Sequence, residues 1–269
     1  MERYKFALRP KWILSHVLIL VLIVVMINLG FWQLRRLHEK KAYNASVRAN
    51  ESQPIAPIDD VIKTTDSTSA GTAEAFRRVT ITGTYDTSQE IMIRNRSSNT
   101  RPGVWVETPL RTSAGNAVLV VRGFLPSQGT PDAVPADAEP PSGTVTVVGL
   151  VQETQTAGLF ESNDPNDGHL TDMARVDVVR IQKQLPYTIY PAWVQLQTSN
   201  PAQSAEPEPL AEPVLDEGPH FSYAVQWFIF STIAIVGYPL ILRRSARNRE
   251  SAVEEHESGV DEVPAELTV

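Results

Sequence analysis

The strongest constraint on this chain is an apolar stretch near its C-terminal end, from His220 to Leu242. No charged residue follows His220 within it, and a run of about 20 mainly apolar residues is long enough to cross the hydrocarbon core of a bilayer as a helix. Four arginines come soon after it: Arg243, Arg244, Arg247 and Arg249. We therefore predict a transmembrane helix over 220–242, with a histidine at one end and a basic collar at the other.

A second apolar run lies near the N-terminus and begins at Trp12. It is rich in Leu, Ile and Val, and its length again suits a bilayer. No small-x-small cleavage site follows it, as would be expected after a signal peptide. We therefore predict a short basic segment over 1–11 and an uncleaved transmembrane helix over 12–33.

The charges beside these two spans predict the topology. Arginines follow the second span, whereas the charged residues just before it are acidic: Glu212, Asp216 and Glu217. The positive-inside rule then places both termini in the cytoplasm and the segment between the spans outside. Because residues 1–11 form too short a leader for mitochondrial targeting, we expect a multi-pass protein in the lipid bilayer of a bacterial plasma membrane.

The rest of the chain divides by composition. Residues 34–75 are predicted to form a helix extension followed by a loop, and residues 76–197 an extracytoplasmic β-rich domain. A linker rich in Pro and Glu follows over 198–219, where such a composition favours an extended backbone. After the second span, residues 243–269 form an acidic cytoplasmic tail.

Within the β-rich domain, short runs of apolar and β-branched residues between turn signals predict strands over 79–85, 90–94, 104–110, 117–125, 145–151 and 187–197. Asp172 as N-cap and Pro186 as a stop predict one helix between them. The predicted fold class is an α+β membrane protein. Its two transmembrane helices form a hairpin around one extracytoplasmic antiparallel β-sheet or barrel domain with about one helix.

The composition also excludes several kinds of function. The chain has no cysteine, which excludes disulfides, zinc–cysteine sites, thiol nucleophiles and copper bound through thiolates. A formal net charge of -7 argues against a nucleic-acid partner. The sequence lacks the Gly-x-Ser-x-Gly elbow, the P-loop and the His-Glu-x-x-His motif. We therefore predict no enzyme activity.

His220 is the side chain with the most distinctive setting, at the outer end of an uncharged helix. One interpretation is an interfacial histidine that bonds water or lipid headgroups; the other is an axial ligand to haem, since neutral imidazole is a common haem ligand. A bis-histidine site with His38 is compatible with the second interpretation. Tyr223 and Trp227 lie on or near the same helix face, where they would either flank a porphyrin edge or act as ordinary interfacial aromatics.

Several blocks of the sequence resemble one known family. They are Leu29-Gly30-Phe31-Trp32-Gln33-Leu34-Arg35-Arg36, the first strand from Phe76 to Tyr85, the strand that ends in Arg122-Gly123-Phe124, and His220-x-x-Tyr223-Ala224 at the start of the second span. In this order, with two spans around one outer domain, they are similar to the Surfeit-locus-one family of cytochrome oxidase assembly factors. The resemblance covers nearly the whole chain apart from the linkers and the tail.

The resemblance implies a chaperone in respiratory-chain biogenesis that assists haem a insertion into the catalytic subunit of haem-copper cytochrome c oxidase. It implies His220 as the iron ligand of a transiently bound haem a, with the catalytic subunit and haem a synthase as partners. Expected partner contacts are Gly30, Trp32, Gln33, Arg35, Arg122 and Gly123. The alternative is a haem-free membrane scaffold that stabilises oxidase subunits, and a membrane-anchored enzyme or sensor is less favoured.

Overall fold

The chain divides into two units in a computed structural model, which describes residues 2–131, 133–158 and 164–260. The first unit contains the chain up to Asn44 and from Leu215 onward. The second unit contains Ala45–Val214.

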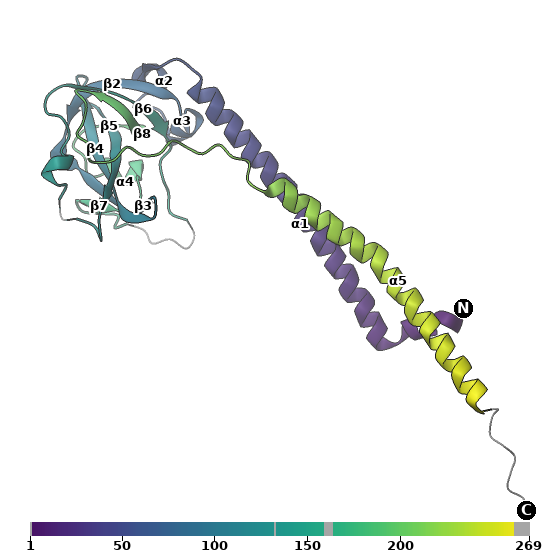
Figure 1. The fold of residues 1–269 in the computed structure, drawn as a ribbon. Coiled ribbons are helices and arrows are strands. Elements are labelled where there is room, and N and C mark those ends of the chain that lie inside the picture. The colour runs from purple at the N-terminus through teal and green to yellow at the C-terminus, as the bar shows by residue number, and fades with distance from the viewer. Residues whose placement is uncertain (1, 132, 159–163, 261–269) are drawn as a thin grey trace, which may run out of the picture. The chain divides into compact units, whose positions relative to one another are not determined.

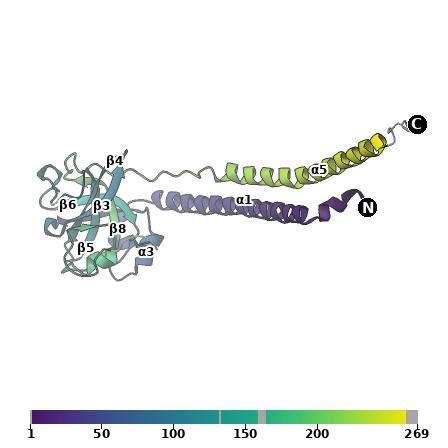
Figure 2. The ribbon, with the colours of Figure 1, turned by 90° about the horizontal axis from the view of Figure 1, so that it is seen from below.

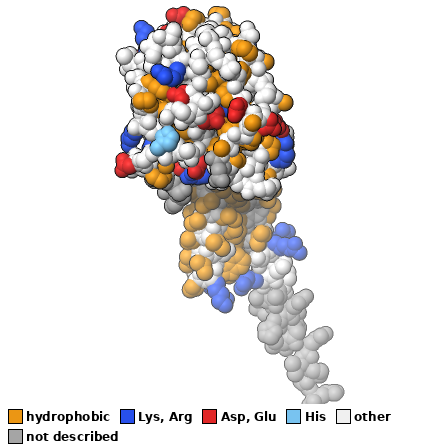
Figure 3. Space-filling model, turned by 90° about the vertical axis from the view of Figure 1, so that its left-hand side faces the viewer, with side chains coloured by type: hydrophobic (Ala, Val, Ile, Leu, Met, Phe, Trp, Pro, Cys, Tyr) orange, Lys and Arg blue, Asp and Glu red, His pale blue; other side chains and the backbone are white. Residues whose placement is uncertain are grey.

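The first unit consists of a short 3-10 helix η1 (Glu2–Leu8) and two long helices, α1 (Pro10–Glu51) and α5 (His220–Val260). Figure 2 shows α1 and α5 side by side. Both helices are long and apolar enough to cross a membrane, with mean hydropathy of 2.7 and 1.8 over their most apolar windows. Only 11% and 6% of these windows is buried, so neither helix resembles the enclosed core helix of a soluble protein. Figure 3 shows the apolar side chains along this unit, with Lys and Arg side chains beyond them.

Small side chains of α5 are buried in this unit. Ala224, Ser231 and Ala246 are almost fully buried, and the first two are seven residues apart, which places them on the same helix face. On α1, Met26 and Leu37 are buried as well. Each of the two long helices therefore has small or apolar side chains that are covered within this unit.

The second unit is built on one eight-stranded sheet whose strand order is β1-β2-β6-β8-β5-β4-β3-β7 (Figure 1). An additional pairing of β2 with β4 closes five of the strands into a barrel. The strands are β1 (Ala56–Pro57), β2 (Arg78–Tyr85), β3 (Ile91–Ser98), β4 (Arg101–Thr112), β5 (Ala117–Pro126), β6 (Val145–Gln152), β7 (Asp172–Met173) and β8 (Ile189–Asn200).

The six predicted strands are confirmed as β2, β3, β4, β5, β6 and β8. The predicted antiparallel sheet or barrel is confirmed as a barrel, but it is not antiparallel throughout, because β5 and β8 are parallel. The closed barrel has five strands, β2-β6-β8-β5-β4, and strands around a ring with an odd number of members cannot alternate in direction throughout. At least one parallel pair is required, and the long connection between β5 and β8 permits it.

The one helix predicted in the β-rich domain is shorter than expected. Asp172 does not cap a helix but belongs to β7, and α4 spans Val178–Gln182 with Asp177 as its N-cap. The Asp177 side chain accepts a hydrogen bond of 3.0 Å from the Arg180 N–H. Two more short helices, α2 (Ile58–Val61) and α3 (Thr68–Ala73), lie in the segment where the sequence predicts a loop.

Strand β5 lies between β8 and β4 in the barrel wall and is buried from Ala117 to Leu125. This explains its near-continuous apolar run, since a strand buried on both faces shows little alternation. The one charged residue in the run is Arg122.

The first half of the Pro- and Glu-rich segment after β8 is bound to the barrel. Glu208 and Phe124 exchange two backbone hydrogen bonds of 2.7 and 2.8 Å, and the Gln195 amide donates to the Leu210 carbonyl at 3.3 Å. The segment therefore covers β5 and β8 before the chain leaves this unit.

Candidate functional site

His220 is the first residue of α5, and its ring contacts Gln33 of α1. His220 Nδ1 lies 2.8 Å from Gln33 Oε1. An amide oxygen can only accept, so Nδ1 donates and carries the proton. In the neutral ring, Nε2 is then the atom with the free lone pair. Among the described residues, Nε2 has no hydrogen-bond partner.

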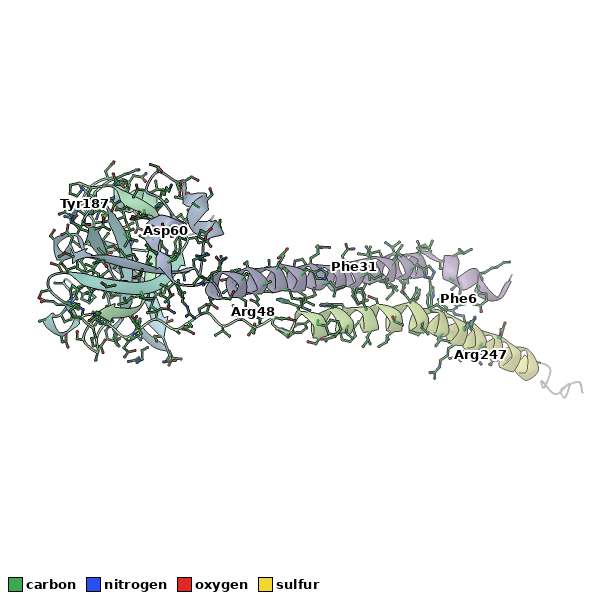
Figure 4. All side chains as sticks on the ribbon, turned by 90° about the horizontal axis from the view of Figure 1, so that it is seen from above. Phe6, Phe31, Arg48, Asp60, Tyr187 and Arg247 are labelled. Atoms are coloured by element: carbon green, nitrogen blue, oxygen red, sulfur yellow. The ribbon has the colours of Figure 1, made fainter. Side chains whose placement is uncertain are left out.

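A close apolar contact lies near this pair, one turn before Gln33 on α1 and about two turns after His220 on α5. A methyl group on Gly30 would come within 2.8 Å of the Phe228 ring, so only glycine leaves room for that ring in its present position. Phe31, which Figure 4 labels on α1, meets the same ring edge-on at a centroid distance of 5.4 Å. Two segments separated by 187 residues in the sequence are thus joined by one hydrogen bond and one aromatic contact.

The backbone just before His220 is held by α1. Asn44 Nδ2 donates to the Asp216 carbonyl at 3.0 Å, and Asp216 accepts in turn from the Gly218 N–H at 3.0 Å. Lys41 and Glu217 form an exposed ion pair at 3.4 Å, which adds little stability in water. These contacts fix where α5 begins, and therefore where the His220 ring lies.

The two predicted flanking aromatics are less tightly placed. Tyr223 is exposed, and Trp227 is half-buried with its ring 6.1 Å from that of Phe230. Neither makes a ring contact or hydrogen bond with His220 among the residues that the structure describes. Their role beside a porphyrin stays a prediction.

His38 is exposed on α1. Five residues separate it from Gln33, which corresponds to a rotation of about 140° around an α-helix. Because Gln33 faces His220, His38 projects from a different side of α1. The geometry therefore does not favour the bis-histidine arrangement.

The predicted partner contacts on α1 fall into two groups. Trp32 and Arg35 are exposed and available to another protein or to lipid headgroups. Gly30 is buried beneath Phe228, and Gln33 is half-buried against His220. The structure thus separates an outward surface from an internal contact within one short motif.

Arg122 was expected to contact a partner, but its side chain is 0% exposed. It donates to Glu90 Oε2 at 2.8 Å, to Thr108 Oγ1 at 2.9 Å and to the Ala138 carbonyl at 2.8 Å. Folded in this way, Arg122 has no surface to present. It neutralises a carboxylate inside the barrel unit.

Gly123, the second expected contact on this strand, also has an internal role. A Cβ atom there would lie 2.3 Å from the Glu208 carbonyl oxygen and 2.8 Å from that of Pro207. Gly123 is therefore required where the segment after β8 crosses β5. Arg122 and Gly123 therefore have internal roles in this unit, and their contact with a partner stays a prediction.

Sequence reasoning missed Glu107 on β4, which is 0% exposed. Neither of its carboxylate oxygens has a hydrogen-bond partner among the described residues. Burial, followed by repulsion from Glu90, raises the pKa of Glu107 well above its ordinary value, and the charge of Arg122 only partly opposes this. The inward position of Glu107 follows from the irregular register of β4 against β5 between Val106 and Glu107. The sequence alone does not show that register, so it offered no signal for this residue.

No group of three or more His, Asp or Glu side chains suitable for a metal ion occurs in the described part of the chain. A site on His220 would therefore have to supply one axial ligand to a metal that brings its other ligands with it. Haem iron, which the porphyrin already coordinates, fits that requirement.

Comparison with known proteins places the chain among relatives of similar length. The model of the SURF1 family matches residues 20–232. An uncharacterized SURF1-like protein of Mycobacterium tuberculosis is 28% identical over 256 residues, covering 94% of this chain and 92% of the relative. A SURF1-like protein of Rickettsia felis is 31% identical over 116 residues, covering 41% and 46%. One of Monosiga brevicollis is 26% identical over 240 residues, covering 84% and 86%. Because the family model spans most of the chain, this protein belongs to the SURF1 family, known generally as cytochrome oxidase assembly factors.

Proposed function

We propose that this protein carries haem a during cytochrome c oxidase assembly and presents it to the catalytic subunit, with His220 Nε2 as the iron ligand. The observation that carries this proposal is the state of the His220 ring. Its Nδ1 is held by Gln33, and its Nε2 has no partner among the described residues. An imidazole held in this way can bind a metal through Nε2 without first breaking a hydrogen bond.

The surroundings of His220 suit a flat apolar ligand. Phe221 is 63% exposed and Tyr223 is 46% exposed, so apolar and aromatic surface lies uncovered beside the histidine. When bound, the haem would supply the iron centre that the oxidase needs. The residues of this chain bind and orient it, and no turnover is required of them.

The proposed topology follows from charge. Arg243, Arg244, Arg247 and Arg249 lie beyond the apolar part of α5, and such residues favour the cytoplasmic side of a bacterial plasma membrane. His220 then lies at the outer surface, as does the β-rich domain. We propose that this protein meets its two partners, haem a synthase and the oxidase catalytic subunit, at that surface.

The test compares wild-type protein with His220→Ala, each purified from cells that synthesise haem a. We expect a haem absorption spectrum from the wild type and its loss in the variant. His38→Ala is the matched control, because it removes an exposed histidine from the same unit. Equal haem content in the wild type and in His220→Ala would overturn the assignment.

A haem-free scaffold is the second candidate function, favoured by the exposed Trp32 and Arg35 on α1. Large exposed aromatics and arginines are frequent anchors of protein interfaces. For a scaffold, oxidase subunits would co-purify with protein that lacks haem, and Trp32→Ala would reduce that co-purification. Loss of the haem spectrum in His220→Ala distinguishes the first candidate from the second.

A further inference from the structure

Among the residues that the structure describes, Gln33 is the one side chain that forms a hydrogen bond with the His220 ring. We propose that Gln33 is the positioning residue for His220: its amide oxygen holds the ring in the Nδ1–H form and leaves Nε2 without a hydrogen bond for the ligand to displace. The consequence for haem rests on the function proposed above. The hydrogen bond itself can be tested without haem.

The position of Gln33 on α1 allows it to do this. Gly30, Gln33 and Leu37 follow one another at intervals of three and four residues, so they share one face of α1. Gly30 and Leu37 are both buried, and they enclose the glutamine from either side along the helix. A glutamine side chain confined in this way loses less conformational entropy on binding than a free one.

The position of His220 is fixed independently. Ala224, one turn further along α5, is 1% exposed, so that face of α5 is covered in this unit. The Asn44 hydrogen bond to the Asp216 carbonyl sets the backbone before the helix. The two partners are therefore held from separate sides, and the distance of 2.8 Å between their atoms follows from packing around both of them.

An amide partner has a particular chemical consequence. Ligating histidines usually donate their second N–H to a carboxylate, a backbone carbonyl or water, and that contact fixes the tautomer and raises the basicity of the ligating nitrogen. A neutral amide oxygen withdraws the Nδ1 proton less strongly than a carboxylate does. Gln33 thus orients the ligand while leaving the bond to the metal weaker than a carboxylate would make it, which suits a carrier that must release its cargo.

The experiment uses the full chain in lipid nanodiscs, with haemin as the probe. Gln33→Met removes the acceptor at similar volume, and Gln33→Glu replaces the amide with a carboxylate. We expect haemin affinity to fall by about 10–100-fold in Gln33→Met, the range for lost partners of metal ligands, and to be retained or increased in Gln33→Glu. The control is Asn28→Leu, because Asn28 is exposed on α1 and donates to the Val24 carbonyl of its own helix at 2.8 Å.

The reduction potential of bound haem separates positioning from a purely structural role. A stronger acceptor on Nδ1 makes the imidazole a better donor and stabilises ferric iron, so the potential should rise in Gln33→Met and fall in Gln33→Glu. A residue that merely packs between helices would weaken binding in both variants and leave the potential unchanged. That result, or wild-type affinity and potential in Gln33→Met, would overturn the proposal.

Nitrogen NMR of histidine-labelled protein without haem tests the hydrogen bond alone. We expect the Nδ1–H form of His220 in the wild type and a mixture of tautomers in Gln33→Met. The Nε2–H form in the wild type would overturn the positioning role, whatever the haem data show. If the wild type gives the expected NMR result but binds no haemin, the carrier function falls while the positioning of His220 by Gln33 stands.

Discussion

Two histidines in the helical unit are bonded differently, and the difference indicates which of them is available for chemistry. Both ring nitrogens of His16 are occupied: Nδ1 lies 2.6 Å from the Tyr238 hydroxyl and Nε2 lies 3.1 Å from the Ala7 carbonyl. His220 has a partner for Nδ1 alone among the described residues. Both ring nitrogens of His16 thus have hydrogen-bond partners, whereas only one ring nitrogen of His220 has.

The surroundings of His16 strengthen this contrast. Its ring meets that of Tyr238 edge-on, and the Tyr238 hydroxyl also forms a hydrogen bond of 3.1 Å with Ser15. Nearby, the Arg249 guanidinium lies 4.7 Å from the centre of the Phe6 ring, and Figure 4 labels Phe6 and Arg247 at this end of the helix pair. His16 belongs to a closed polar network, which stabilises a fold, whereas an open nitrogen can accept a ligand.

The barrel unit extends the comparison to a charged group. Arg122 is satisfied by three acceptors, as His16 is satisfied by two. If satisfied polar groups are structural, removing them must cost stability, and the cost must scale with burial and charge. The following predictions test that rule, beginning with the largest effect.

Arg122→Met should destabilise the protein most. It leaves the Glu90 carboxylate, which is 14% exposed, without its cation, and breaking a buried ion pair on one side costs about 3–5 kcal/mol. Urea unfolding of the full chain, followed by tryptophan fluorescence, measures the loss, since Trp105 and Trp193 lie in this unit with ring centroids 6.1 Å apart. The control is Arg101→Met, which breaks the exposed Arg101–Glu208 pair and should cost far less. Equal losses in the two variants would contradict the rule.

Glu107→Gln should stabilise the protein instead of destabilising it, because Glu107 is buried without a partner among the described residues. The pKa of Glu107 is raised in the folded protein, chiefly by burial. Between the ordinary value and the raised one, the folded state binds the proton more tightly than the unfolded state does. Stability therefore falls as pH rises through that window, by up to about 1.4 kcal/mol per pH unit, and is unaffected below it.

The glutamine variant cannot ionise, so it should lose this dependence and be more stable than the wild type above the window. Unfolding free energies measured across the pH range, as differences from the wild type, isolate the contribution of this residue. Glu139→Gln, at an exposed position, should leave the slope unchanged. A wild-type slope that survives in Glu107→Gln would show that other groups cause it.

The sequence predicted most of the long helices and strands, but few of the contacts between them. Both long apolar helices and six strands were predicted, because each depends on a local run of residues or a local alternation. The parallel pairing of β5 with β8 was missed, since no local pattern distinguishes it from the antiparallel pairs. His220 was singled out from its setting at the end of an uncharged helix. Its hydrogen bond to Gln33 was not, because the two residues lie 187 positions apart and neither local pattern contains the other.

Burial of charge was the other part that the sequence did not predict. Arg122 lies in an otherwise apolar strand, and such an arginine is compatible with either a docking surface or an internal ion pair. Whether Arg122 is buried depends on its three acceptors, Glu90, Thr108 and the Ala138 carbonyl, which belong to three other segments. The same holds for Glu107, whose inward position depends on the register of β4 against β5.

Tyr238→Phe should have the smallest effect and tests the histidine comparison directly, because it leaves His16 with one open nitrogen, as His220 has. Loss of one neutral hydrogen bond costs about 1 kcal/mol, so the melting temperature in nanodiscs should fall slightly. Haemin binding should not increase, because the ring at position 238, whose centroid lies 5.6 Å from that of His16 in the wild type, remains beside the opened Nδ1 in the variant. A second haemin equivalent bound by Tyr238→Phe, absent from Tyr238→Phe with His16→Phe, would show that an open nitrogen alone is sufficient. Binding that stays at the wild-type level would show that an open nitrogen is not sufficient and must also face space for the ligand.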